Sequence, residues 1–140
     1  MVSIKRFLTL IVLIVLLAMV TPSAFCADEK IITYYFHGNA RCSTCHKMEE
    51  YAKEAIEENF KDKLASGLLI FQTVNIDEKE NEHFIAEYAL YTKALIVSRV
   101  GNGKEIEHKN LTKIWEYVRN KKKFFAYVTT EINAYLQDSR

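Results

Sequence analysis

Hydrophobic and polar positions alternate with different periods along the chain, and each period predicts an element of secondary structure. Residues 31–36, IITYYF, are β-branched and aromatic, which predicts a buried strand. From Cys42 the apolar positions recur at helical spacing, which predicts an amphipathic helix that Ser66-Gly67 ends. Residues 68–76 predict a second strand, and its apolar start indicates burial on both faces. The apolar stripe of the helix consists of Met48, Tyr51, Ala52, Ala55, Ile56 and Phe60.

The pattern changes again after Asp77, which begins a polar turn. Residues 94–100 predict a third strand, and residues 101–103, GNG, form a hairpin signal. Residues 104–108 carry the charges that are expected of a returning edge strand. Between the turn and the third strand, a second amphipathic helix is marked by Phe84, Ile85, Tyr88 and Ala89.

The last part of the chain predicts a closing helical region with two apolar stripes. Residues 120–123, NKKK, are expected to break or bend the helix between them. The resulting order, β-α-β-α-β-β-α, predicts an α/β domain whose first two strands are parallel and joined by a right-handed crossover. The first stripe consists of Leu111, Ile114, Trp115 and Val118, and the second of Phe125, Val128, Ile132 and Leu136.

The N-terminal residues 1–26 have the layout of an export signal. Lys5 and Arg6 precede a charge-free apolar run, and small residues follow Pro22. Cleavage before Ala27 would remove Cys26 and leave a mature domain of residues 27–140. The same run is nearly long enough to remain as a membrane anchor, and Cys26 offers a third alternative, a lipidated N-terminus. All three place the domain outside the cytoplasm, in the periplasm or anchored on the extracytoplasmic side, where disulfides persist.

Composition narrows the class of protein further. A chain of 140 residues argues for one domain. Without the leader, 17 basic residues face 18 acidic ones, so the charge balance offers no case for nucleic-acid binding. The chain has three cysteines, and the two outside the leader are too few for a disulfide-scaffold miniprotein.

Those two cysteines, Cys42 and Cys45, are separated by Ser-Thr and lie where the first strand meets the first helix. A thiol at a helix N-terminus faces unsatisfied N–H groups and the positive end of the dipole, which favour the thiolate. The neighbouring Arg41 adds positive charge. We therefore predict that Cys42 attacks a partner and that Cys45, one turn further on, resolves the mixed disulfide.

Three other uses of the pair compete with this prediction. A structural disulfide would close so short a loop that it would restrict the unfolded chain little. His46 extends the motif to C-x-x-C-H, the attachment pattern of c-type haem, but the distal ligand would have to be His83 or His108 in what reads as an α/β domain. A soft metal is the third, with Cys42, Cys45 and His37 as candidate ligands.

The chain resembles thioredoxin-fold proteins over nearly all of residues 30–136. The resemblance rests on the strand–Cys42-Ser-Thr-Cys45–helix unit, on residues 74–77, VNID, and on the third strand with its GNG hairpin. It implies a three-layer sandwich around a mixed four-stranded sheet. The implied strand order is 68–76, 31–36, 94–100 and 104–109, with the last strand antiparallel.

Residues 35–38, YFHG, and 41–45, RCSTC, are more closely similar to a group of small exported thioredoxin-like proteins. Some of these are named as a subunit of a nitroaromatic-compound nitroreductase linked to arsenical resistance. Three departures from thioredoxins stand out. Arg41 replaces the tryptophan before the first cysteine, and the strand at 31–36 lacks the buried carboxylate. Lys93 or Ala94 falls where thioredoxins have a cis-proline, so we predict a trans peptide there.

These observations together predict an exported thiol–disulfide oxidoreductase that needs no cofactor. Its partner is expected to be a specific redox protein with a thiol or disulfide, or a membrane-side electron donor. Cys42 and Cys45 would carry the chemistry, and Arg41, His37, Lys93 and Ala94 would support them. The alternative is an accessory subunit of the same fold that uses the cysteine pair to bind a metal or metalloid or to dock an enzyme.

Overall fold

The computed structural model describes residues 29–138, so the predictions for the leader, residues 1–26, lie outside the described residues. A short 3-10 helix covers Lys79–Asn81. The strands are β1 (Lys30–His37), β2 (Leu69–Asn75), β3 (Ala94–Gly101) and β4 (Lys104–Asn110). The helices are α2 (Ser43–Asn59), α3 (Lys61–Ala65), α4 (His83–Glu87), α5 (Ile114–Tyr117) and α6 (Lys121–Asp138).

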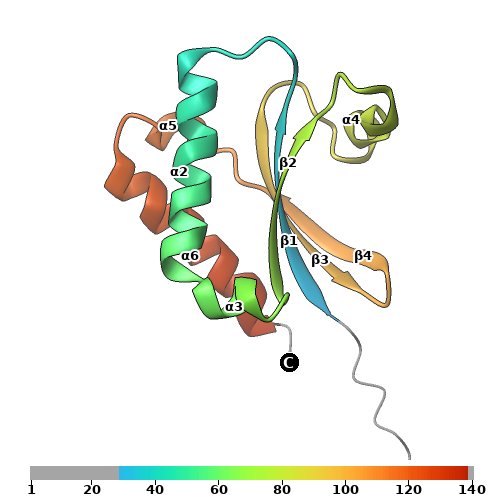
Figure 1. Cartoon of the computed structure of the whole chain (residues 1–140), viewed down its shortest axis with the longest axis vertical. Coiled ribbons are helices and arrows are strands. Elements are labelled where there is room, and N and C mark those ends of the chain that lie inside the picture. Colours follow the sequence, from blue (N-terminus) through green and yellow to red (C-terminus); the bar gives the residue numbers. More distant parts are fainter. Residues whose placement is uncertain (1–28, 139–140) are drawn as a thin grey trace, which may run out of the picture.

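The four strands form one mixed sheet in the order β2-β1-β3-β4. β1 and β2 are parallel, as predicted, whereas β3 runs antiparallel to β1 and β4 antiparallel to β3. This order and these directions give the α/β thioredoxin-like fold that the sequence predicts. Figure 1 shows α2 and α6 side by side on one face of the sheet and the short α4 on the other.

The core lies in two clusters, one on each face of the sheet. The larger cluster packs the sheet against α2 and α6, and its central side chains are fully buried. The smaller one lies under α4, and this second outer layer is thin because α4 has a single turn. Members of the larger cluster include Ile31, Tyr35, Met48, Ile56, Leu95, Val97, Phe124 and Ile132. The smaller cluster consists of Phe36, Tyr88, Leu90, Ala94 and Ile96.

β2 lies at an edge of the sheet, which corrects the prediction that both of its faces are buried. Only Leu69 is buried along this strand, and Gln72 and Thr73 are exposed. The apolar start predicts burial on two faces. β2 has no neighbouring strand on its outer side within residues 29–138, so most of its side chains stay partly or fully exposed.

The first helical region begins at Cys42 and ends at Ser66-Gly67, as predicted, but it is divided. α2 ends at Asn59, and Phe60 leaves helical geometry with φ −131° before α3 begins. Phe60 remains 5% exposed and so stays in the core. Gly67 has φ 75°, the left-handed conformation that commonly ends a helix.

The second predicted helix is shorter than its apolar pattern suggests. α4 ends because Ala89 adopts a left-handed conformation with φ 48°. The Leu90 N–H then donates to the Ile85 carbonyl at 2.9 Å, which is the bond of a Schellman ending. The prediction for Ile85 was wrong, because this side chain is 40% exposed instead of joining Tyr88 in the core.

The β3–β4 hairpin forms where the GNG signal predicts it. Asn102 and Gly103 have φ 52° and 75°, so both central residues are left-handed, as a tight hairpin of this kind requires. Every residue of β4 is exposed, which agrees with its charged sequence.

The closing helical region breaks at Asn120, where the sequence predicts a break. The Asn120 side chain accepts a hydrogen bond from the Lys123 N–H at 3.0 Å and so caps α6. The second apolar stripe is shifted by one position at its start, because Phe124 is fully buried and Phe125 only half-buried. Within residues 29–138 no helix combines the length and the apolar character needed to cross a membrane.

Candidate functional site

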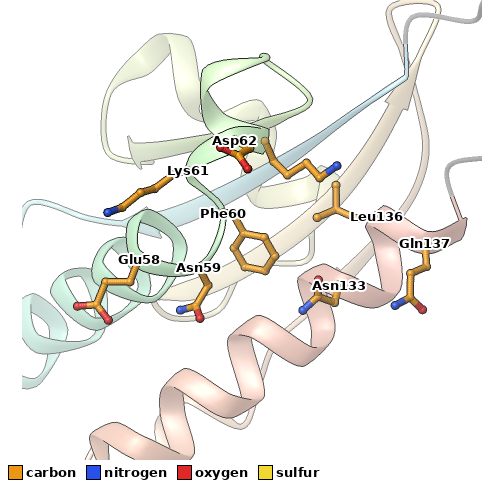
Figure 2. Close-up of a pocket in the computed structure, with 9 residues that line it drawn as sticks. Glu58, Asn59, Phe60, Lys61, Asp62, Asn133, Leu136 and Gln137 are labelled. Atoms are coloured by element: carbon orange, nitrogen blue, oxygen red, sulfur yellow. The ribbon is translucent and has the colours of Figure 1, made fainter.

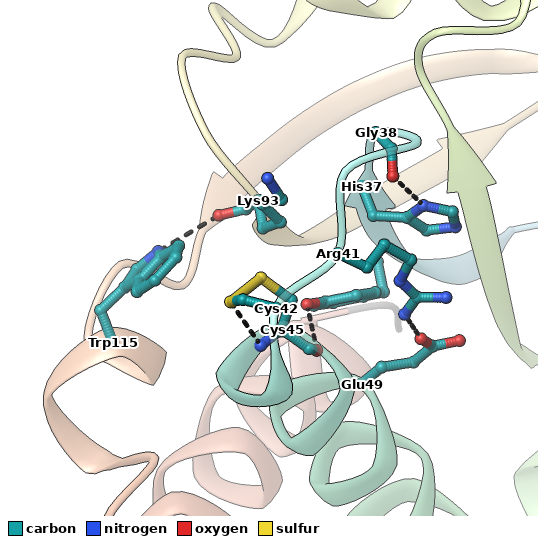
Figure 3. Close-up of a disulfide and its surroundings, with 9 residues drawn as sticks. His37, Gly38, Arg41, Cys42, Cys45, Glu49, Lys93 and Trp115 are labelled. Carbon is teal, nitrogen blue, oxygen red and sulfur yellow. Dashed lines mark hydrogen bonds and ion pairs between the residues drawn. A yellow bond between two sulfur atoms is a disulfide. The ribbon is translucent and has the colours of Figure 1, made fainter.

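Cys42 and Cys45 are joined by a disulfide at the N-terminus of α2, with their Cα atoms 5.1 Å apart (Figure 3). Cys42 is the N-cap of the helix, with extended backbone at φ −91° and ψ 166°. Its Sγ accepts a hydrogen bond from the Cys45 N–H at 3.3 Å. The sulfur of Cys42 therefore takes the place that a serine or aspartate oxygen usually has at a helix N-terminus.

The two cysteines differ in exposure. Cys42 is exposed, whereas Cys45 is 2% exposed and belongs to the core. No acidic residue lies in the first turn of α2, so no carboxylate there offsets the positive end of the helix dipole, which stabilises a thiolate at Cys42. After reduction, the exposed sulfur is the one that a partner can reach and the one that the helix stabilises as thiolate.

Tyr35 of β1 supports the disulfide from below. Its hydroxyl donates a buried hydrogen bond to the Cys45 carbonyl at 2.7 Å. Burial raises the pKa of Tyr35 to about 12, although the Arg41 charge works in the opposite direction. The hydroxyl therefore keeps its proton at neutral pH. It fixes the first turn of α2 but cannot replace the buried carboxylate that thioredoxins have, which agrees with the absence of acidic residues from this strand.

Arg41, in the loop before Cys42, pairs with a carboxylate on α2. Its guanidinium forms an ion pair with Glu49, and Figure 3 shows the side chain directed toward Glu49 and away from the sulfurs. Both side chains are only partly exposed, at 21% and 24%. Glu49 also accepts a hydrogen bond from the Thr73 hydroxyl at 3.2 Å. Through Glu49, Arg41 therefore holds the loop before Cys42 against α2 and β2, and its charge is directed to this carboxylate instead of to the thiols.

The loop between β1 and Cys42 is fixed by the end of β2. The Asp77 carboxylate accepts a hydrogen bond from the Asn39 N–H at 2.6 Å. The Asn75 amide donates to the Asn39 side-chain oxygen at 2.8 Å. A Cβ atom at Gly38 would lie 2.8 Å from an Asp77 carboxylate oxygen, so a larger residue there would displace the Asp77 side chain. Sequence reasoning missed these positioning roles, although VNID was noted as a motif.

The segment before β3 lies on the other side of the cysteines. Lys93 is half-buried and Ala94 is 4% exposed. The peptide bond between them is trans, since residues 29–138 contain no cis bond. The Trp115 indole donates to the Lys93 carbonyl at 3.2 Å, and Figure 3 shows this side chain directed toward the cysteine pair. Trp115 was predicted as part of an apolar stripe, but it is 40% exposed because α5 has only one turn.

The histidines do not gather around the sulfurs. His37 is directed away from the disulfide in Figure 3, and its Nδ1 lies 3.0 Å from the Gly38 carbonyl. His46 is exposed on the solvent side of α2. Residues 29–138 contain no group of three or more His, Cys, Asp or Glu side chains arranged to hold a metal ion. His83 and His108 are exposed as well.

One cavity borders the loop that leads into the cysteine pair, and a second lies at the far end of α2. A cleft of about 200 Å³ borders the loop before Cys42 and the segment before β3, and Tyr91 at its rim is 96% exposed. A second cavity, of about 540 Å³, lies where α2, α3 and the end of α6 meet (Figure 2). It is at the opposite end of α2 from the disulfide and is lined mainly by polar side chains. Residues that line the cleft are Gly38, Ala40, Ile76, Asp77, Leu90, Tyr91, Thr92 and Lys93.

No protein-family model and no curated protein matches the chain. Among solved structures, a thioredoxin from Fasciola hepatica is 20% identical, with a TM-score of 0.39, over 66% of this chain and 81% of that one. A mutant thioredoxin from Entamoeba histolytica is 17% identical, with a TM-score of 0.39, over 67% and 87%. A thioredoxin from Thermus thermophilus is 14% identical, with a TM-score of 0.38, over 64% and 72%. Similarity at this level carries no functional information, and the fold assignment rests on the sheet topology.

Proposed function

We propose that this protein exchanges disulfides with a partner protein, with Cys42 as the attacking thiol and Cys45 as the resolving thiol. The observation that carries the proposal is the asymmetry of the pair. Cys42 is exposed and caps α2 through its sulfur, while Cys45 lies in the core with its carbonyl held by Tyr35. A purely structural crosslink needs no such difference in exposure.

The exchange runs in two steps. The Cys42 thiolate attacks one sulfur of a partner disulfide, a Cys42–partner bond forms, and the other partner sulfur leaves as a thiolate. The Cys45 thiolate then attacks the Cys42 sulfur and releases the second partner sulfur. The partner disulfide is reduced by two electrons, and Cys42–Cys45 becomes the disulfide seen here. The reverse sequence oxidises a partner dithiol.

The surroundings of Cys42 favour a protein as partner. Trp115 and Tyr91 present exposed aromatic surface near the site, at 40% and 96% exposure. Aromatic side chains are enriched at the centres of protein interfaces.

The proposal extends to the location of the chain, because the leader predicts export to a compartment in which disulfides persist. The mass of the exported protein tests whether the leader is cleaved before Ala27, and a mass that includes residues 1–26 would contradict cleavage.

Trapping with variants that keep one cysteine of the pair tests the exchange. In Cys45→Ser the mixed disulfide cannot be resolved, so the variant should accumulate a covalent adduct that a reducing agent releases. Cys42→Ser is the matched control, because it keeps only the buried cysteine of the pair, and Cys45 should trap little. Equal trapping by both variants, or none by Cys45→Ser together with no exchange by the unmodified protein, would overturn the proposal.

A further inference from the structure

The two edges of the sheet differ in how they are protected. β4 carries Lys104, Glu105, Glu107, His108 and Lys109, so an added strand would meet charges at most positions. β2, with the sequence LIFQTVN, carries no charged residue. Charged residues on an edge strand are a common protection against pairing with another chain. Only the β4 edge has this protection.

Within residues 29–138, alternate residues of β2 have no strand partner on the outer side of the sheet. Ile31 N donates to Leu68 O, and Ile76 N donates to His37 O, each at 2.8 Å. In a parallel ladder with this register, the even-numbered residues of β2 turn their N–H and C=O groups toward β1. Leu69, Phe71 and the odd-numbered residues after them therefore turn these groups outward.

One end of this outward edge is already closed. The Asn75 carbonyl accepts a hydrogen bond from the Asn81 amide at 2.9 Å, so the turn after β2 covers it. The open part is Leu69–Thr73, in which the backbone N–H and C=O groups of Leu69, Phe71 and Thr73 point away from β1. No strand within residues 29–138 pairs with it. The length of this part is ordinary for a strand pairing.

We propose that the open edge of β2 pairs antiparallel with β2 of a second copy of this chain, about a two-fold axis at Phe71. In this register Phe71 faces Phe71 of the second copy, and Leu69 faces Thr73. Every outward residue of the open part then belongs to a hydrogen-bonded pair, and each such pair exchanges two hydrogen bonds. The two sheets form one continuous sheet.

At a two-fold axis each residue meets its own copy, so an uncharged strand such as β2 can pair with itself without repulsion between like charges. A charged residue there faces its own charge and is repelled, which disfavours self-pairing through β4. At the β2 axis the facing side chains are Phe71, and the flanking pair is Ile70 with Gln72. Phe71 is half-buried against the core, so part of its ring is free for the contact.

Substitution at Thr73 tests the pairing, because its N–H points outward and does not enter the ladder with β1. Thr73→Pro removes this N–H, and Thr73→Val is the matched control that keeps the N–H but also loses the hydroxyl bond to Glu49. Light scattering during gel filtration of the chain at high concentration should show a dimer for the unmodified protein and for Thr73→Val. Thr73→Pro, with its fold checked by circular dichroism, should be a monomer.

Hydrogen exchange on the unmodified protein supplies a second measurement that needs no variant. The Phe71 and Thr73 amides should exchange more slowly at high protein concentration than on dilution. A monomer at all concentrations, a dimer that Thr73→Pro leaves intact, or protection of these amides only when another protein is added would overturn the pairing. None of these results depends on thiol exchange, so the proposed function is tested separately.

Discussion

The Asp77 carboxylate accepts a hydrogen bond at 2.6 Å from the backbone N–H of Asn39, across 38 positions of sequence. The bond joins the end of β2 to the loop that leads into Cys42. The Asn75 amide also donates to the Asn39 side-chain oxygen, so Asn39 is held by two residues at the end of β2. The position of the first cysteine is therefore set from the neighbouring strand as well as from its own helix.

Removal of this acceptor should destabilise the protein. Asp77→Ala leaves the Asn39 N–H without its carboxylate, and a hydrogen bond at this exposed site contributes about 0.5–1.5 kcal/mol. We expect the free energy of unfolding in urea to fall by that amount. Glu80→Ala removes the same charge from an exposed position of the same segment and should change it little. Equal losses in the two variants would contradict the role of Asp77.

Tyr35→Phe should alter both stability and its dependence on alkaline pH. The variant leaves the Cys45 carbonyl without its buried donor, which costs about 1–3 kcal/mol. In the unmodified protein the native pKa of Tyr35 is about 12, above the value of about 10 in an unfolded chain. Its contribution is complete below pH 10 and is lost as the pH rises toward 12.

The alkaline limb of the stability profile tests this assignment. Other tyrosines also have raised pKa values, so both proteins lose stability above pH 10. The loss should be steeper in the unmodified protein than in Tyr35→Phe, because only the former keeps the Tyr35 proton in the native state. Parallel alkaline limbs would show that Tyr35 titrates normally.

The polar cluster around Glu105 should govern the stability of the protein at acid pH. Burial acts to raise the pKa of Glu105, but hydrogen bonds from Ser98, Tyr88 and His108 outweigh it and lower this pKa below its usual value. The contribution of Glu105 is therefore present above about pH 4.3 and is lost as the pH falls through the lowered native pKa. Glu105→Gln should be less stable at neutral pH and should lose less stability on acidification. The exposed Glu116→Gln is the control, and a Glu105→Gln profile that matches it would contradict this assignment.

Trp115 should report the redox state of the pair. It is the only tryptophan of the chain, its indole donates to the Lys93 carbonyl, and Figure 3 shows it directed toward the disulfide. Disulfides quench a neighbouring indole, so reduction should increase the emission of Trp115. The increase should be absent from the Cys42→Ser variant, which has no disulfide to reduce. Identical spectra of the oxidised and reduced protein would contradict the placement of Trp115 at this site.

The sequence predicts the elements of this fold where local signals are strong. The β-branched run of β1, the start of the helix after Cys42 and the Asn102-Gly103 turn each specify one local conformation, and all three form as predicted, although the helix divides at Phe60. The motif places Cys42 and Cys45 at a helix N-terminus for the same reason. These predictions need no information from distant parts of the chain.

The remaining features depend on tertiary contacts that no local pattern encodes. Phe124 and Phe125 fit the helical stripe equally well, and packing against α2 buries the first. The contact of Asp77 with Asn39 and the bond of Trp115 to Lys93 arise only when the chain has folded. Arg41 was predicted to add charge near the thiol, and only the structure reveals its pairing with Glu49.

The most direct test of the central claim is the order in which the two reduced cysteines react. The reduced protein is treated briefly with iodoacetamide at neutral pH, and the modified residue is identified by peptide mass. Because Cys42 is exposed at a helix N-terminus and Cys45 is buried, Cys42 should be alkylated at least about ten times faster. Equal rates, or faster modification of Cys45, would contradict the assignment of Cys42 as the attacking thiol.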